Sequence, residues 1–104
     1  MLILVQNESS TGLVCSEGTV FQIPLALFAT WQQELAKGLG EVVSKEGRAI
    51  GEKLMRSPVA DVTRDACWGR VGETFGEDPM LVAHFSSEEV KRIQGEDYRK
   101  HCGP

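Results

Sequence analysis

The chain has 104 residues, of which 41% are apolar and 25% charged, and its formal net charge is −4. This length allows one domain with a modest core, and the ordinary composition excludes a disordered chain. Eleven Lys and Arg are scattered among fifteen Asp and Glu. That argues against a nucleic-acid partner, because phosphate neutralisation requires clustered cations. A membrane partner is not expected either, since no run approaches the roughly eighteen apolar residues of a membrane-spanning helix.

The first predicted element is a strand over Leu2–Val5, whose consecutive apolar residues are typical of a parallel strand buried on both faces. The run is too short for the apolar core of a signal peptide, and the cellular location stays open. Glu8 is expected just past the carboxyl end of this strand, which is where ligands bind in α/β proteins. A solvated loop acid is the alternative for Glu8, and both interpretations remain open.

Residues 19–29 are apolar but aperiodic, and Pro24 argues against a central strand, so we expect a packed loop with a short turn. A helix is predicted to begin at Thr30, whose hydroxyl is a suitable N-cap and whose capping box Gln33 would close. Gly51 is its predicted end. Its apolar stripe consists of Leu35, Leu39, Val42, Val43 and Ile50. Three internal glycines each weaken a helix by about 1 kcal/mol relative to Ala, so its stability must come from packing.

A second strand is predicted over Lys53–Ser57, and the order strand, helix, strand predicts a parallel pair and an α/β fold. A second helix should begin at Asp78-Pro79, which combines an N-cap with proline at the first helical position. It should reach Gly95, with a break at Ser86–Glu89, because these residues form another capping box.

Between the second strand and the second helix lies a polar segment, Pro58–Pro79, with seven charged side chains, three glycines and a tryptophan. Such density indicates a polar lining around a small ligand. Paired carboxylates are what glycoside hydrolysis uses, but spacing alone selects no pair here. Asp61 with Arg64, or Asp65 with Arg70, can equally be ion pairs that shape the loop.

Two side chains of the polar segment suit a sugar. The guanidinium of Arg70 can hold two hydroxyls of one ligand, and Trp68 offers an indole face, although a core anchor is an equal alternative for Trp68. Neither the three cysteines nor the two histidines have the spacing of a metal or redox site. We therefore expect no metal ligand and no cofactor.

A set of short motifs runs through and around the polar segment: Pro58–Val62, Arg64-Asp65, Trp68–Arg70 and Glu73–Pro79 within it, and Ala29–Trp31, Glu34-Leu35, Glu46–Gly51, Leu81-Val82 and Ile93–Gly95 outside it. Together they resemble the signature of family 3 glycoside hydrolases, the β-glucosidase and β-xylosidase group. The resemblance covers roughly residues 2 to 95.

The resemblance implies a (β/α)8 TIM-barrel fold with the sugar site at the carboxyl ends of the strands. A full barrel takes about 250 residues, so this chain would form a partial barrel of two to three βα units. Residues 1–95 would be a fragment of the family's N-terminal domain, and residues 96–104 an unstructured or altered tail. Partners would be the missing remainder of the barrel or a self-association partner, because isolated units expose sheet edges and apolar helix faces.

The implied reaction is retaining hydrolysis of terminal non-reducing β-D-glycosides, β-xylosides or β-glucosides, with an aspartate nucleophile and a separate acid/base carboxylate. Both catalytic groups would lie beyond the part of the family pattern present here, so no residue is assigned a catalytic role. The chain alone is expected to be inactive. The alternative is a catalytically inactive carbohydrate-binding or remnant fragment.

Glu8 and Arg70 match the two family positions that contact a small carbohydrate substrate in the innermost subsite. Glutamate at the first position is implied to favour xylosides. The sequence departs from the family pattern at Thr11, where histidine is usual, at Ala66-Cys67, where proline and arginine are usual, and at Phe28, where a small residue is usual.

Overall fold

The computed structural model describes residues 6–95. Its elements are, in chain order, β1 (Gln6–Glu8), α1 (Pro24–Phe28), α2 (Gln33–Ala49), β2 (Leu54–Arg56), the 3-10 helix η1 (Val71–Glu73) and α3 (Pro79–Gln94). The strand predicted at Leu2–Val5 and the tail 96–104 lie outside the described residues. Within residues 6–95, no helix combines the length and apolar content required to cross a membrane.

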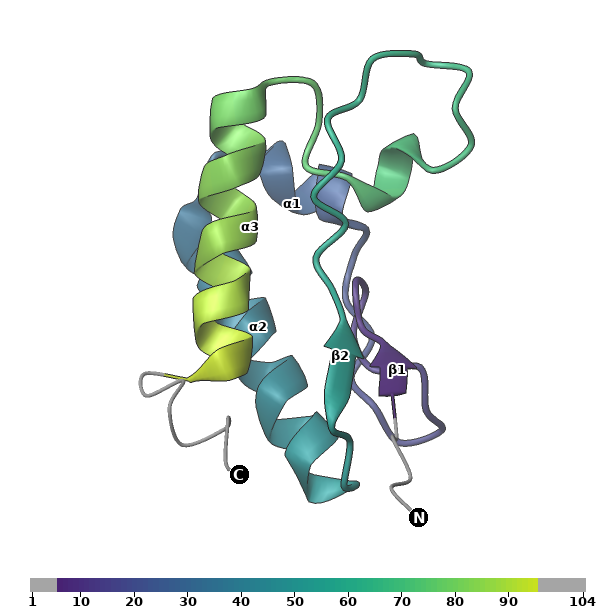
Figure 1. Ribbon diagram of the computed structural model, residues 1–104, viewed down its shortest axis with the longest axis vertical. Helices are drawn as coiled ribbons and strands as arrows, with labels where there is room; N and C mark the ends of the chain where they lie inside the picture. The colour runs from purple at the N-terminus through teal and green to yellow at the C-terminus, as the bar shows by residue number, and fades with distance from the viewer. Residues whose placement is uncertain (1–5, 96–104) are drawn as a thin grey trace.

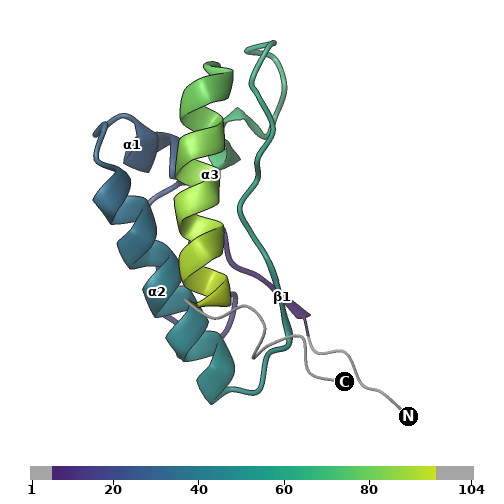
Figure 2. The ribbon, with the colours of Figure 1, turned by 60° about the vertical axis from the view of Figure 1, so that its left-hand side comes forward.

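β1 and β2 pair in parallel, which confirms the predicted α/β arrangement. Asn7 is opposite Met55, and Glu8 is opposite Arg56. Helices α2 and α3 lie side by side next to the strands and run in the opposite direction to them (Figures 1 and 2). The expectation that Glu8 follows the strand was wrong, because Glu8 is the last residue of β1. Strand pairing uses backbone groups, so a polar side chain does not end it.

Residues 24–28, expected in a loop, form the short helix α1. Pro24 is its first residue, where the missing N–H costs nothing because no intrahelical acceptor exists for it. Leu27 of this helix is buried together with Phe75 and Phe85. The apolar composition of the stretch therefore reflects a buried helix face.

The predicted helix start at Thr30 was also wrong. Trp31 has φ of 59°, a left-handed conformation that turns the chain and cannot belong to a right-handed helix. The Thr30 hydroxyl donates to the carbonyl of Leu27 and accepts the N–H of Gln32, at 2.7 and 3.2 Å. It thus stabilises the turn, and α2 begins after Gln32.

The interface between α2 and α3 depends on close backbone approach. A Cβ on Gly40 would lie 2.7 Å from the carbonyl oxygen of Glu89 on α3. Val43 of α2 is fully buried. Leu35 and Ile50, which were predicted on the same apolar face of the helix, remain 40% and 50% exposed. As the glycine content predicts, α2 is held by packing rather than by helix propensity.

α3 begins as predicted: the Asp78 carboxylate accepts the N–H groups of Met80 and Leu81 at 2.8 and 3.0 Å. It ends before Gly95, as predicted, where φ is 84°. The break expected at Ser86 was wrong. Ser86 and Glu89 are both buried within a continuous helix, so they face the interior instead of capping a new start.

Candidate functional site

The polar segment extends from β2 and returns to α3 (Figure 1). Phe75 anchors it to the core. Phe75 is fully buried, and its ring centroid lies 5.5 Å from that of Phe85. The neighbouring Thr74 hydroxyl bonds that of Thr63 at 2.8 Å. Trp68 is only half-buried. The core anchor of this segment is therefore Phe75, which the sequence reading did not single out.

Phe28, at a position where a small residue is usual in the resembled family, fills space beside this anchor. Its ring contacts Trp31 and Phe85, with centroids 5.8 and 5.6 Å away. A Cβ on Gly76 would lie 3.1 Å from the Phe28 ring, and Gly76 also has φ of 99°. Gly76 is thus required both by its backbone conformation and by this contact.

The carboxylates of the polar segment mostly brace the backbone or pair with a cation. Asp65 accepts the N–H of Cys67 at 2.9 Å, and Asp78 caps α3. The ion pair considered between Asp65 and Arg70 is absent from the described residues. Arg70 instead donates from Nε and Nη2 to one oxygen of Glu73, at 2.9 and 2.6 Å.

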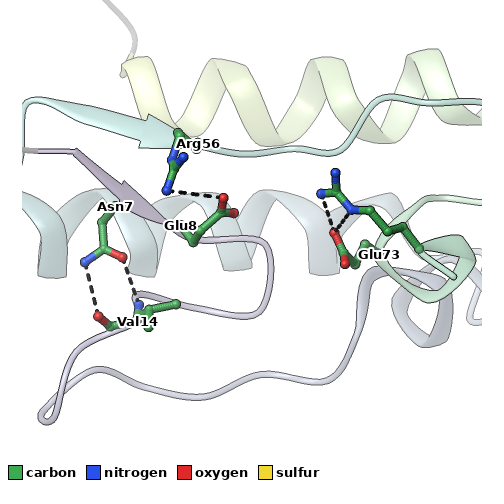
Figure 3. Close-up of polar contacts among 6 residues, drawn as sticks. Asn7, Glu8, Val14, Arg56 and Glu73 are labelled. Atoms are coloured by element: carbon green, nitrogen blue, oxygen red, sulfur yellow. Dashed lines mark hydrogen bonds and ion pairs between the residues drawn. The ribbon is translucent and has the colours of Figure 1, made fainter.

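Glu8 lies at the end of β1 and pairs across the sheet with Arg56, 3.4 Å away (Figure 3). Both side chains are about half exposed, at 46% and 53%. Asn7, on the opposite face, exchanges two hydrogen bonds of 3.3 Å with the backbone of Val14 and so closes the loop after β1 (Figure 3). Glu8 is therefore held at a strand end by its own ion pair and by a braced loop.

Arg70 precedes η1, which packs against α1, and a Cβ on Gly72 of η1 would lie 3.2 Å from Ile23. The hydrogen bond to Glu73 raises the pKa of Arg70 above its ordinary value, and the charges of Glu8 and Asp61 raise it further. Glu8 and Arg70 make no direct bond; Arg70 bonds Glu73, and Glu8 bonds Arg56.

The two charged residues offer complementary chemistry, Glu8 at the carboxyl end of β1 and Arg70 on the polar segment that follows β2. A carboxylate accepts hydrogen bonds from hydroxyls, and a guanidinium donates to two oxygens at once. We call this surface the outer side; it comprises Glu8, Arg56, Arg70 and Glu73. The inner side lies behind it and consists of the half-buried Ser57 and the buried Thr74, Phe75 and Glu89. Glu89 was missed by sequence reading, because its spacing from Ser86 imitates a capping box.

Two hollows lie away from Glu8 and Arg70. One, about 270 Å³, is a largely apolar groove along α2 that includes Leu27, Leu35 and Gly38. The other, about 520 Å³, is open and polar, and lies between Arg64 and the start of α3. We place the candidate site on the outer side nevertheless, because a sugar requires convergent donors and acceptors more than an apolar groove.

The side chains that could ligate a metal ion are scattered in the described part of the chain. Within residues 6–95, no three His, Cys, Asp or Glu side chains lie close enough to hold a metal ion. Cys15 and Cys67 are exposed and form no disulfide.

Comparison with known proteins connects this geometry to one family. Residues 1–101 match the model of the glycosyl hydrolase family 3 N-terminal domain. A β-xylosidase of Formosa agariphila is 38% identical over 74% of this chain and 11% of its own length. A periplasmic β-glucosidase of Salmonella typhimurium is 35% identical over 80% of this chain and 11% of its own.

A solved structure of a β-glucosidase involved in saponin metabolism from intestinal bacteria superimposes with a TM-score of 0.87 at 33% identity. The match covers 91% of this chain and 12% of that one. The chain therefore spans about an eighth of the length of the proteins it resembles. The likeness confirms the predicted fold class, an α/β unit that corresponds to part of a larger barrel.

Proposed function

Because the chain belongs to glycosyl hydrolase family 3, with residues 1–101 in its N-terminal domain, we propose that it supplies sugar-binding residues to a retaining β-glycosidase. The substrates would be terminal non-reducing β-D-glycosides, either β-xylosides or β-glucosides. The predicted family is confirmed by the match, and the named relatives are a β-xylosidase and a β-glucosidase.

One observation carries this proposal: Glu8 at the end of β1 and Arg70 before η1 are exposed charged side chains from separate elements, each already held by an ion pair, with Arg56 and Glu73 respectively. Arg70 would donate to two neighbouring hydroxyl oxygens, and Glu8 would accept hydroxyl protons of the same ring. Glu73 already orients Arg70, and Arg56 already orients Glu8, so the two side chains would lose little conformational freedom when a sugar binds.

The catalytic step would require groups from outside this chain. Retaining hydrolysis uses two carboxyl groups about 5 Å apart, one of which attacks the sugar. On the outer side, Glu8 and Glu73 are each bonded to an arginine, which favours an orienting role over nucleophilic attack. We therefore assign Glu8 and Arg70 to substrate binding and no residue of this chain to catalysis.

The binding test is a titration of the labelled chain with xylose and with glucose, followed by amide chemical shifts. We expect saturable chemical-shift changes at amides near Glu8 and Arg70, with a lower Kd for xylose than for glucose. In Arg70→Ala and Glu8→Gln the changes should no longer saturate. Lys45→Ala removes a comparable exposed ion pair, that with Glu41 on α2, and should bind as the wild type does. Equal binding by Arg70→Ala and Lys45→Ala would refute the assignment.

The activity test uses nitrophenyl β-xyloside and nitrophenyl β-glucoside. We expect no hydrolysis by the purified chain. Turnover that survives repurification and disappears in Glu8→Gln or Glu73→Gln would show that the catalytic groups lie within this chain. Saturable binding without turnover would also fit the alternative, an inactive carbohydrate-binding module; sugar hydrolysis by a longer protein containing this sequence would exclude that alternative.

A further inference from the structure

Glu89 is an acid buried on the inner side, against the end of β2. Its side chain is on α3, it is only 1% exposed, and its carboxyl oxygen accepts a hydrogen bond from the hydroxyl of Ser57. Ser57 directly follows Arg56, the last residue of β2. The contact therefore joins α3 to the strand end from which the polar segment departs.

The pleat of the strand places this contact behind the candidate site. Successive side chains of a strand point to opposite faces, and Arg56 points to Glu8 on the outer side. Ser57, the next residue, points inward to Glu89. A change at Glu89 would thus displace Ser57 and, one residue away, the arginine that holds Glu8.

Within residues 6–95, no ion pair holds the Glu89 carboxylate. Burial raises its pKa to about 7, and the hydrogen bond from Ser57 offsets only part of that rise. The charged side chains on the surrounding elements bond elsewhere: Lys37 to Glu34 and Glu88, Lys91 to Glu88, Arg56 to Glu8, and Arg48 to the carbonyl of Ile93, while Arg92 attracts Glu41. Its buried surroundings therefore suit the neutral acid.

We propose that Glu89 is a positioning residue for the outer side: as a neutral acid it holds Ser57 and the end of β2, so that Glu8 and Arg70 keep their sugar-binding geometry, and its ionisation releases them. The ligand part of this inference rests on the proposed function. Its structural part, the link between Glu89 and Glu8 through β2, stands without any ligand. Sugar binding would weaken as Glu89 loses its proton, because the charged form requires water that the packed interface excludes.

The experiment follows two signals between about pH 5.5 and pH 8.5. The first is the carboxyl carbon resonance of Glu89, together with the amide resonances of Glu8 and Arg56, in the free chain. The second is the Kd for xylose. We expect Glu8 and Arg56 to shift with the titration of Glu89, and Kd to rise roughly tenfold, the equivalent of about one pKa unit of coupling.

Glu89→Gln should keep the site assembled and abolish the pH dependence of Kd. Glu88→Gln, a change at a neighbouring acid paired with lysines on the surface, and His84→Gln, at an exposed histidine of the same helix, should leave it intact. Should Glu89→Gln fail to fold, Ser57→Ala serves instead: Glu89 would still titrate, but Glu8, Arg56 and Kd would no longer follow it.

Two results in the free chain would overturn the structural link: a Glu89 titration near the ordinary glutamate value, or a raised Glu89 pKa with no accompanying change at Glu8 and Arg56. Absence of sugar binding at every pH, with these amide shifts intact, would refute the proposed function and leave the structural link standing. Binding that is independent of pH while Glu89 titrates would refute the positioning role and leave the proposed function standing.

Discussion

Glu73 and Phe75 are two residues apart in the chain, yet they lie on opposite sides of the polar segment. The Glu73 side chain is 39% exposed and bonded to Arg70, whereas Phe75 is fully buried against Phe85. Glu8 and Glu89 repeat this contrast at the strand ends, one in water with a cation and the other buried with a neutral hydroxyl. Exposed ion pairs contribute little to stability, so the outer side can serve a ligand while the inner side stabilises the fold.

The largest expected effect on stability is that of Phe75→Ala, on the inner side. Removing a buried aromatic ring typically lowers the free energy of unfolding by about 3–5 kcal/mol, because the cavity collapses only in part. Chemical denaturation followed by circular dichroism measures the change. Trp68→Ala, at the half-buried aromatic of the same segment, should cost clearly less. Equal losses would mean that the segment is not anchored by its inner side.

Glu89 should make the chain less stable as the pH rises. Its pKa is about 7 in the folded state and near 4.5 when unfolded, so the folded state binds the proton more tightly. Its contribution is complete below about pH 4.5 and falls by about 3 kcal/mol as the pH approaches 7. Unfolding free energies measured across this range, with Glu89→Gln as the reference that lacks this titration, check the prediction. A wild type whose stability does not fall relative to that of Glu89→Gln over the same interval would contradict it.

Asp78→Ala should have a smaller effect, about 1 kcal/mol, although Asp78 is exposed. The cause is loss of the two N–H hydrogen bonds at the start of α3. Asp78→Asn should retain most of the stability, since an amide oxygen also caps. Glu77→Ala is the matched control at a neighbouring exposed acid. Thermal unfolding midpoints of the three variants measure these differences. A loss in Asp78→Ala alone would show that this exposed carboxylate stabilises the fold through backbone hydrogen bonds rather than through its charge.

The smallest expected effect on stability is that of Glu73→Gln on the outer side. The Arg70 hydrogen bond lowers the pKa of Glu73, so the stabilisation it provides exists above the ordinary glutamate pKa and is lost as the pH falls through the lowered value. This direction is opposite to that of Glu89. Because the pair is exposed, we expect a barely measurable change in the unfolding midpoint at neutral pH, and none at about 1 M salt. A loss as large as that of Asp78→Ala would contradict the separation of the two sides.

Sequence motifs of a few adjacent residues predicted several features of the fold correctly. Asp78-Pro79 marked the start of α3, Gly51 the end of α2, and the order of elements the parallel pairing of β1 and β2. Each rests on the backbone preferences of a few adjacent residues, and such preferences act in almost any tertiary context. Consecutive motifs in the polar segment likewise predicted the family.

Predictions failed where a distant contact competes with a local preference. Thr30 has the chemistry of an N-cap, but Trp31 adopts a left-handed turn beside Phe28, and Gln32 precedes the helix instead. For the candidate site, sequence reading selected Glu8 and Arg70 as ligand contacts, which stays a prediction. It did not identify their partners Arg56 and Glu73, because several oppositely charged residues lie within reach along the chain.

The sequence by itself determined the α/β order, the end of α2, both ends of α3 and the concentration of charge in one segment, since these follow from local backbone preferences and composition. The tertiary structure alone decided which polar residues are buried. Glu88 and Glu89 are adjacent and chemically identical, but the packing of α3 on α2 and β2 leaves the first among lysines and encloses the second beside Ser57. Burial depends on which helix face meets a neighbour, and that is settled only when distant segments pack together.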